Sequence, residues 1–194
     1  MQYNQMQIIK RRFFAMRNGI IADTLRKAGL DYRMIFGLNL PQITDIAADL
    51  PHTPSLAAEL WADTRTRESL LLAPMLYPVM EMSTGTAAAW LAQAPTTEVA
   101  DVLCLRLLRR HPDALAIALD ALDAPAEITR YAALRLLFNL LILAQSPTSG
   151  SHGQAAALAA DIRPHIEAAL ASATPLTRPI AAQLLDEIDF SLES

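Results

Sequence analysis

The sequence predicts an all-α fold in which consecutive helices pack as antiparallel pairs. Alanine and leucine dominate the 194 residues and only three valines occur, so helix-forming residues greatly outnumber β-branched ones. No segment shows the alternating pattern and tight turns of paired strands. Proline and glycine divide the chain into pieces of helical length. Together these observations predict a protein built almost entirely from short helices.

The helix boundaries follow from capping residues and prolines. A proline at a first helical turn is indicated by Leu40-Pro41, Thr53-Pro54, His111-Pro112 and Thr174-Pro175, and threonine caps by Thr84 and Thr96. Connections of a few residues then force neighbouring helices to pack antiparallel. We expect helices at roughly 4–17, 20–28, 41–50, 54–62, 65–76, 84–94, 96–110, 112–123, 126–145, 154–172 and 176–190.

The helix pairs recur about every 30–45 residues, which is the period of HEAT-type solenoids. The sequence therefore predicts a HEAT-like α-α superhelix, with residues 1–194 forming a single domain. The stretch SPTSGSHG at residues 146–153 reads as a flexible insertion between two late helices. Roughly 40 residues follow it, too few for an independent core, so we do not interpret it as a domain linker.

Composition restricts the classes of function. The 53% hydrophobic and 19% charged residues are typical of a globular protein, and no apolar run is long enough to span a bilayer. A single cysteine excludes an internal disulfide and favours a reducing compartment, so we expect a cytoplasmic protein with no membrane partner. The four histidines and the cysteine show no metal-ligand spacing, and no cofactor motif is present, so neither a metal nor a cofactor is expected.

Charge is distributed unevenly along the chain. The formal net charge is −4, yet residues 1–33 hold seven bases and two acids, a local charge of +5. Residues 141–194 hold two bases and six acids, a local charge of −4. This polarity is compatible with one basic face that contacts phosphate, or with an ordinary solvated helix surface.

Two segments of the first half of the chain have a distinctive pattern. The first is YRMIFGLNLP at residues 32–41, and the second is LAAELW at residues 56–61, followed by Arg67-Glu68 and Ala73. Both resemble the DNA alkylation repair (AlkD-like) family of HEAT-like repeat proteins, the first through that family's aromatic-Phe-Gly turn before a helix that opens with proline. We interpret these residues as architectural: Gly37 forms a turn, Trp61 fills the core, and Glu68 pairs with a neighbouring arginine.

The resemblance also implies which positions of this chain correspond to the catalytic residues of the family's glycosylases. Glycosylases of that family place a tryptophan and an aspartate four residues apart on a mid-chain helix, where the carboxylate stabilises the cation left on the sugar. In the best register, Ala100 occupies the tryptophan position and Cys104 the aspartate position. A thiol does not replace a carboxylate in this role. Asp101, one turn before Cys104, is a weak candidate for a displaced catalytic carboxylate, or else an ion-paired surface residue.

Two groups of residues are candidates for nucleic-acid binding. Three arginines gather at the end of the expected helix at 96–110, where they contact phosphate or offset the helix dipole. A polar stripe follows the helix at 126–145, where it faces a cleft or pairs with acids such as Asp101 or Asp120. The candidates are Arg106, Arg109, Arg110, Arg130, Tyr131, Arg135 and Asn139.

Three hypotheses follow. The first is a non-catalytic module that binds nucleic acid or a protein through a concave basic face, with duplex DNA as the nucleic-acid partner. The second is a DNA glycosylase that excises alkylated purines using a carboxylate such as Asp101. The third is a protein-interaction scaffold, which the acidic final third of the chain favours.

Overall fold

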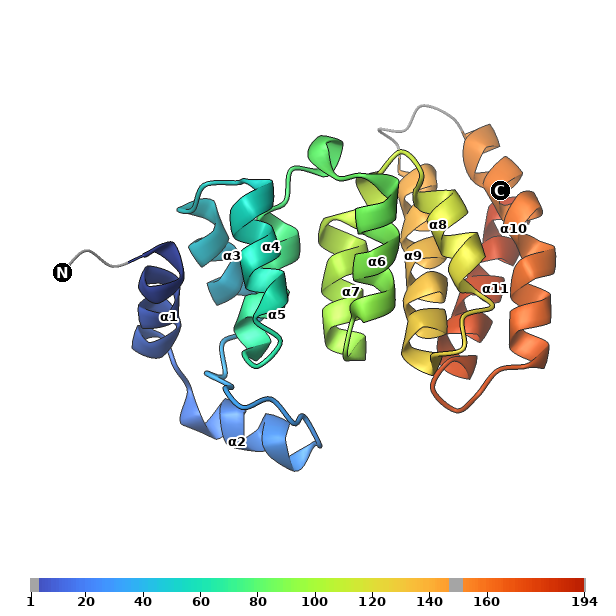
Figure 1. Ribbon diagram of the computed structural model, residues 1–194. Coiled ribbons are helices and arrows are strands. Elements are labelled where there is room, and N and C mark those ends of the chain that lie inside the picture. The colour runs from blue at the N-terminus through green and yellow to red at the C-terminus, as the bar shows by residue number, and fades with distance from the viewer. Residues whose placement is uncertain (1–3, 147–151, 194) are drawn as a thin grey trace. The chain divides into compact units, whose positions relative to one another are not determined.

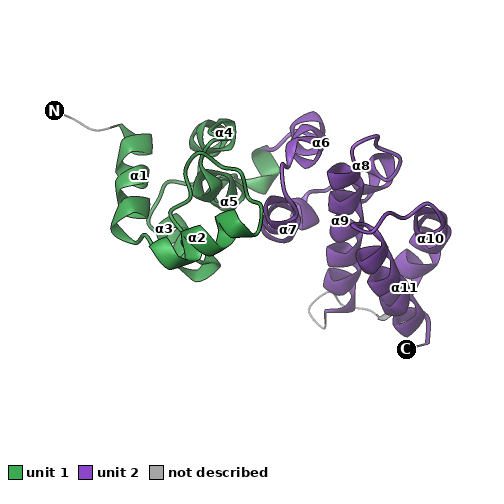
Figure 2. Cartoon of the chain, turned by 90° about the horizontal axis from the view of Figure 1, so that it is seen from below, with its two compact units in different colours: residues 1–81 green, residues 82–194 purple. Residues whose placement is uncertain are grey.

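The computed structural model describes residues 4–146 and 152–193. Over these residues it forms eleven α-helices and two short 3₁₀ helices, with no strand, which confirms the all-α prediction. The insertion expected at residues 146–153 lies largely outside the described residues. The chain divides into two compact units, residues 1–81 and 82–194 (Figures 1 and 2). A single domain over residues 1–194 therefore stays a prediction.

Over residues 4–81, the first unit contains five α-helices and a 3₁₀ turn. Capping boxes at Asn4 and Asn39 begin two of the helices, and Pro54 lies at the start of another, after its cap Thr53. Trp61 is buried, which confirms its expected place in the core. The elements are α1 (Gln5–Ala15), α2 (Gly19–Lys27), α3 (Leu40–Ala48), α4 (Pro54–Ala62), α5 (Arg67–Leu76) and η1 (Val79–Glu81).

A buried carboxylate fixes the segment between α2 and α3. The side chain of Glu68 is fully buried and accepts hydrogen bonds from the backbone N–H groups of Phe36, at 3.1 Å, and Gly37, at 2.9 Å. Arg67 Nη1 donates to Glu68 Oε1 at 2.9 Å and to the Leu38 carbonyl at 3.0 Å. These contacts confirm the predicted structural ion pair.

Gly37 occupies a position that no other residue fits. Its φ of +77° lies in the left-handed region, and a Cβ atom there would stand 2.2 Å from the carbonyl oxygen of Asn18. The Asn18 N–H also donates to the Phe36 carbonyl at 2.8 Å, so the start of α2 packs directly against this turn. The turn expected from the sequence is therefore confirmed together with its physical reason.

In its described residues, 82–146 and 152–193, the second unit contains six α-helices in two layers. Helices α7, α9 and α11 form one layer, in which α9 packs between the other two. Helices α6, α8 and α10 form the second layer: α6 and α8 pack against α9, and α10 packs against α9 and α11 (Figures 1 and 2). This is the stacked-pair arrangement that the helix spacing predicts. The elements are α6 (Thr84–Gln93), α7 (Thr97–Arg106), η2 (Leu108–Arg110), α8 (Ala114–Ala121), α9 (Glu127–Gln145), α10 (His152–Ala171) and α11 (Arg178–Glu193).

One expected helix is interrupted. The sequence predicted a continuous helix over 96–110, but α7 ends at Arg106 and the last turn tightens into the 3₁₀ helix η2. Leu107, between the two, has φ −122° and ψ −68°. Pro112 disfavours helical geometry at His111, whose φ of −72° and ψ of 136° are extended, so the helix must end just before it.

No helix in residues 4–146 or 152–193 combines the length and apolar character needed to cross a membrane. The same residues contain no group of three potential metal ligands among histidine, cysteine, aspartate and glutamate.

Candidate nucleic-acid interface

Three of the predicted residues meet between α7 and α9. Asp101 Oδ1 accepts a hydrogen bond from the Tyr131 hydroxyl at 2.9 Å and another from Arg135 Nε at 2.7 Å. Arg135 Nη2 also lies 3.3 Å from the Tyr131 hydroxyl, closing a triangle of contacts. The polar stripe on α9 therefore pairs with Asp101, one of the two acids named from the sequence. Asp120, the other, lies on the surface of α8.

This triangle lies at the edge of solvent. The side chains of Arg135 and Asp101 keep 26% and 40% of their surface exposed, and the Arg135 guanidinium lies over the rings of Tyr131 and Phe138 at 5.9 and 5.7 Å. Burial raises the pKa of Tyr131, and the charge of Asp101 adds to that rise although Arg135 opposes it. The phenol therefore stays protonated and donates to the carboxylate. Asp101 is committed to two donors and is poorly placed to stabilise a new cation.

The two positions that the resemblance assigns to catalysis are inside the protein. Ala100 and Cys104 are both completely buried, and the Cys104 thiol donates to the Ala132 carbonyl at 3.4 Å. Burial and the nearby charge of Asp101 raise the pKa of this thiol, so it stays neutral. Cys104 acts as a small core residue, and no substrate reaches it in this packing.

The three arginines at the end of α7 and in η2 lie close enough for their charges to repel. Burial lowers the pKa of Arg109, and the charges of Arg110 and Arg106 lower it further. No ion pair among residues 4–146 and 152–193 includes any of the three, and the buried Nε of Arg109 has no hydrogen-bond partner there. We call Arg106, Arg109 and Arg110 the arginine turn. An anion bound at the surface of this cluster would relieve its repulsion.

Arg130 is not part of this cluster. Its guanidinium donates to the carbonyls of Ala124, at 2.7 Å, and Pro125, at 3.0 Å, in the loop that precedes α9. The next residue on α9, Tyr131, meets Asp101 in the middle of α7, whereas the arginine turn lies at the end of α7 and in η2. We interpret Arg130 as a structural residue that holds the α8–α9 loop through these two hydrogen bonds.

Asn139, the last residue of the predicted stripe, is buried. Only 7% of its surface is exposed, and its Nδ2 has no hydrogen-bond partner in the described part of the chain. The i, i+4, i+8 spacing placed it in line with Tyr131 and Arg135, but an α-helix has 3.6 residues per turn and such a line rotates towards the core. Asn139 therefore does not share the exposed face of Arg135.

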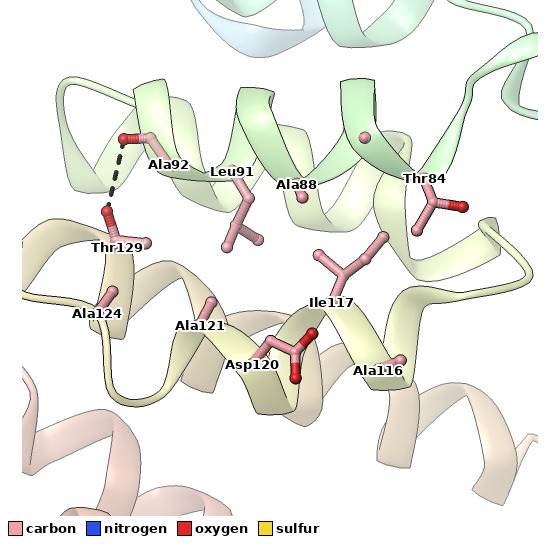
Figure 3. Close-up of a pocket in the computed structure, with 11 residues that line it drawn as sticks. Thr84, Ala88, Leu91, Ala92, Ala116, Ile117, Asp120, Ala121, Ala124 and Thr129 are labelled. Atoms are coloured by element: carbon pink, nitrogen blue, oxygen red, sulfur yellow. Dashed lines mark hydrogen bonds between the residues drawn. The ribbon is translucent and has the colours of Figure 1, made fainter.

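Sequence reasoning did not find a hollow of about 350 Å³ on the other layer of this unit. It lies between α6 and α8, and small or apolar side chains such as Ala88, Leu91 and Ile117 line it, with Asp120 as the charged residue among the lining (Figure 3). The signal was present in the glycine and alanines at one face of α6, but small residues on a helix mostly indicate close helix packing. None of the predicted site residues lines this hollow.

The stacked helix pairs have the fold of the HEAT-like helical repeats. A solved structure described as "a new family of proteins related to the HEAT-like repeat DNA glycosylases with affinity for branched DNA structures" is similar to this chain, with a TM-score of 0.77 and 16% identity, covering 95% of this chain and 76% of that one. This likeness confirms the HEAT-like fold predicted from the sequence. No protein-family model matches the sequence. The search of curated proteins also found no match.

Proposed function

We propose that this protein is a non-catalytic DNA-binding module with a HEAT-like repeat fold. The observation that carries the proposal is the arginine turn: three neighbouring cations for which residues 4–146 and 152–193 provide no carboxylate partner. Arginine suits this role because its planar donors match phosphate oxygens. The similar solved protein belongs to a family with affinity for branched DNA, which favours nucleic acid over other anions.

Absence of catalysis forms part of the same proposal. Excision of an alkylated base needs an anion next to the sugar, and the corresponding position holds the buried, neutral thiol of Cys104. The nearest carboxylate, Asp101, is already neutralised by Arg135 at 2.7 Å. For the protein to act as a glycosylase through Asp101, the ion pair between Asp101 and Arg135 would have to break when DNA binds.

The test is a titration of labelled DNA at several salt concentrations, with a duplex and a four-way junction measured side by side. Affinity should fall with salt by a slope of about 0.9 per phosphate neutralised. Replacing both Arg109 and Arg110 by alanine should reduce that slope by about two if each arginine contacts one phosphate. Equal slopes for the variant and the original protein would contradict the proposed contacts.

A matched control exists in the same unit. Arg163 pairs with Glu167 and Asp189, at 2.9 and 2.7 Å, and Arg178 donates to the Ala173 carbonyl. Replacing Arg163 and Arg178 by alanine removes the same formal charge from the same unit. This control should leave the slope unchanged. An equal loss in both variants would mean that net charge, and no specific contact, determines the affinity.

A protein partner is the second candidate, favoured by the charge of the unit that carries the arginine turn. Residues 82–194 hold seven bases and twelve acids, a formal net charge of −5, which opposes a long DNA contact. The apolar hollow between α6 and α8, with Asp120 in its lining, suits an apolar side chain next to a basic one (Figure 3). No binding of duplex or junction at about 50 mM salt would leave this candidate as the surviving function.

A further inference from the structure

The first unit has its own depression, separate from the arginine turn. Three hollows of about 380, 270 and 220 Å³ lie between α1, α2 and the segments 33–36 and 63–66. They adjoin one another, because Met34 borders all three, Phe14 borders two and Arg33 borders two. We call this group of adjoining hollows the N-terminal hollow. Together they suit a ligand larger than a single phosphate ion.

Positive charge dominates the N-terminal hollow. Its lining includes two acids, and each has a basic partner: Asp63 lies 2.9 Å from Lys10, and Asp23 lies 3.6 Å from Arg26. The hydrogen bonds from Lys10 and Ser69 hold the pKa of Asp63 below its usual value although burial opposes this, so the carboxylate stays charged and occupied by Lys10. The six bases of the lining are Lys10, Arg11, Arg17, Arg26, Arg33 and Arg65.

After these pairings, the hollow keeps a surplus of cations. Arg17, Arg33 and Arg65 take part in no ion pair among residues 4–146 and 152–193. All three are exposed at the surface. Guanidinium groups that border one depression without a carboxylate between them attract phosphate oxygens.

An exposed aromatic ring lies among these cations. The side chain of Phe14 is 56% exposed, although its neighbour Phe13 is completely buried. The guanidinium carbon of Arg17 lies 3.9 Å from the centre of the Phe14 ring, and Arg17 Nη1 donates to the Phe14 carbonyl at 2.8 Å. Met34, 37% exposed, borders the same hollows. Exposing this much apolar surface costs free energy, which contact with a flat ligand would recover.

The walls of the hollow are held in place before any ligand arrives. The Met34 N–H donates to the Arg65 carbonyl at 2.9 Å, and the Arg67 N–H donates to the Met34 carbonyl at 3.1 Å, so segment 33–36 is fixed beside segment 63–66. Glu68 binds the backbone of Phe36 and Gly37 directly behind it. A preorganised site loses less entropy when it binds.

We propose that the N-terminal hollow binds an unpaired nucleotide of single-stranded or branched DNA, with the base against Phe14 and Met34 and the phosphates at Arg17, Arg33 and Arg65. A basic groove combined with an exposed aromatic ring is the usual arrangement of single-strand binding sites. Duplex DNA hides its base faces, whereas an unpaired strand exposes them. An acidic peptide would use the cations but has no need for the ring. This inference extends the proposed DNA-binding function to a second site on the other unit.

The test uses the full chain and a fluorescein-labelled oligothymidylate, with anisotropy as the readout. Phe14→Ala should weaken binding by about 5- to 150-fold, which corresponds to the loss of about one stacked base. Phe14→Leu should weaken it as well, because leucine keeps the apolar contact but has no flat face. Phe190→Ala is the matched control, since Phe190 is 62% exposed on α11 of the other unit. A 2-aminopurine base in the strand should lose fluorescence on binding to the original protein but not to Phe14→Ala.

The outcomes separate this inference from the proposed function. If both hold, the double alanine variant of Arg109 and Arg110 weakens duplex binding and spares the single strand, while Phe14→Ala does the reverse. Duplex binding that depends on the arginine turn, together with single-strand binding indifferent to Phe14, would overturn only the inference. Equal binding of polyglutamate, also indifferent to Phe14, would assign the hollow to an acidic peptide and overturn it. Circular dichroism checks that each variant remains folded.

Discussion

Each unit contains an arginine paired with a carboxylate, and the two pairs differ in their surroundings. In residues 1–81, the side chains of Arg67 and Glu68 are 5% and 0% exposed, and Glu68 also holds two backbone N–H groups. In residues 82–194, the side chains of Arg135 and Asp101 are 26% and 40% exposed and bind no backbone group in the contacts described above. The guanidinium and carboxylate groups thus stabilise a buried turn in one unit and remain accessible to water in the other.

The difference shows why charge alone does not identify a binding site. A buried pair cannot exchange its partner for a ligand without leaving an unpaired charge in the core. A pair at the surface exchanges one partner for another at low cost, because water screens both charges. Cations with no carboxylate partner in the described structure, such as the arginine turn and Arg17, Arg33 and Arg65, are available to a ligand at once. The first two experiments below test the contrast between the buried pair and the surface pair, and the third tests whether Asp101 can leave its partner for catalysis.

The largest change in stability is expected from the substitution Glu68→Ala. The change removes the carboxylate that accepts from the buried guanidinium of Arg67 and from the N–H groups of Phe36 and Gly37. We expect the free energy of unfolding to fall by about 3–5 kcal/mol. Urea denaturation measures it, and Glu59→Ala, at an exposed position of α4, is the control that should change little. A loss below about 1 kcal/mol would show that the pair is dispensable and the comparison wrong.

A smaller effect is expected from Arg135→Ala. Asp101 keeps 40% of its side chain exposed, so water can solvate it once Arg135 is removed. We expect a loss of about 0.5–1 kcal/mol, including the contacts of the guanidinium with Tyr131 and Phe138. Arg135→Lys should recover only part of it, because lysine lacks the planar fork. A loss as large as that of Glu68→Ala would place Asp101 in a buried environment and remove the distinction between the two pairs.

The smallest expected effect is on base release. Incubation of the protein with methylated duplex DNA should release no alkylated purine above background, because Ala100 and Cys104 are buried where a tryptophan and an aspartate would be required. Chromatography of the released bases provides the measurement. Release that disappears in Asp101→Asn would identify Asp101 as a catalytic carboxylate and would require its pair with Arg135 to open.

The sequence predicted the helices well because their ends depend on local signals. Proline at Pro54 and side-chain caps such as Thr53 and Thr96 act within a few residues, and each lies where a helix begins. The break at Leu107 was missed, because no glycine or proline lies within residues 97–111 and Pro112 comes five residues later. The ion pair of Glu68 with a neighbouring arginine was also predicted, and that arginine is Arg67, the preceding residue in the chain.

The candidate sites were predicted less completely, because surface chemistry depends on which side chains reach the core. Pairing of the α9 stripe with Asp101 or Asp120 was one of two alternatives, and Asp101 does bind Tyr131 and Arg135, whose i, i+4 spacing places both on one face of α9. Asn139 follows the same spacing but turns into the core. The excess of basic residues in 1–33 follows directly from the sequence, but nothing in the sequence indicates that Phe14 is exposed while Phe13 is buried. Only the packing of α1 decides which ring faces water.

The burial of Cys104 has a practical consequence. It is the only cysteine in the chain, it is completely buried, and burial raises the pKa of its thiol. An alkylating reagent reacts with the thiolate and needs access to it, so the folded protein should resist modification. Spectroscopic labels can therefore be attached to a cysteine introduced at an exposed position without first replacing the native one. The slow modification of Cys104 itself then reports how often α7 and α9 separate.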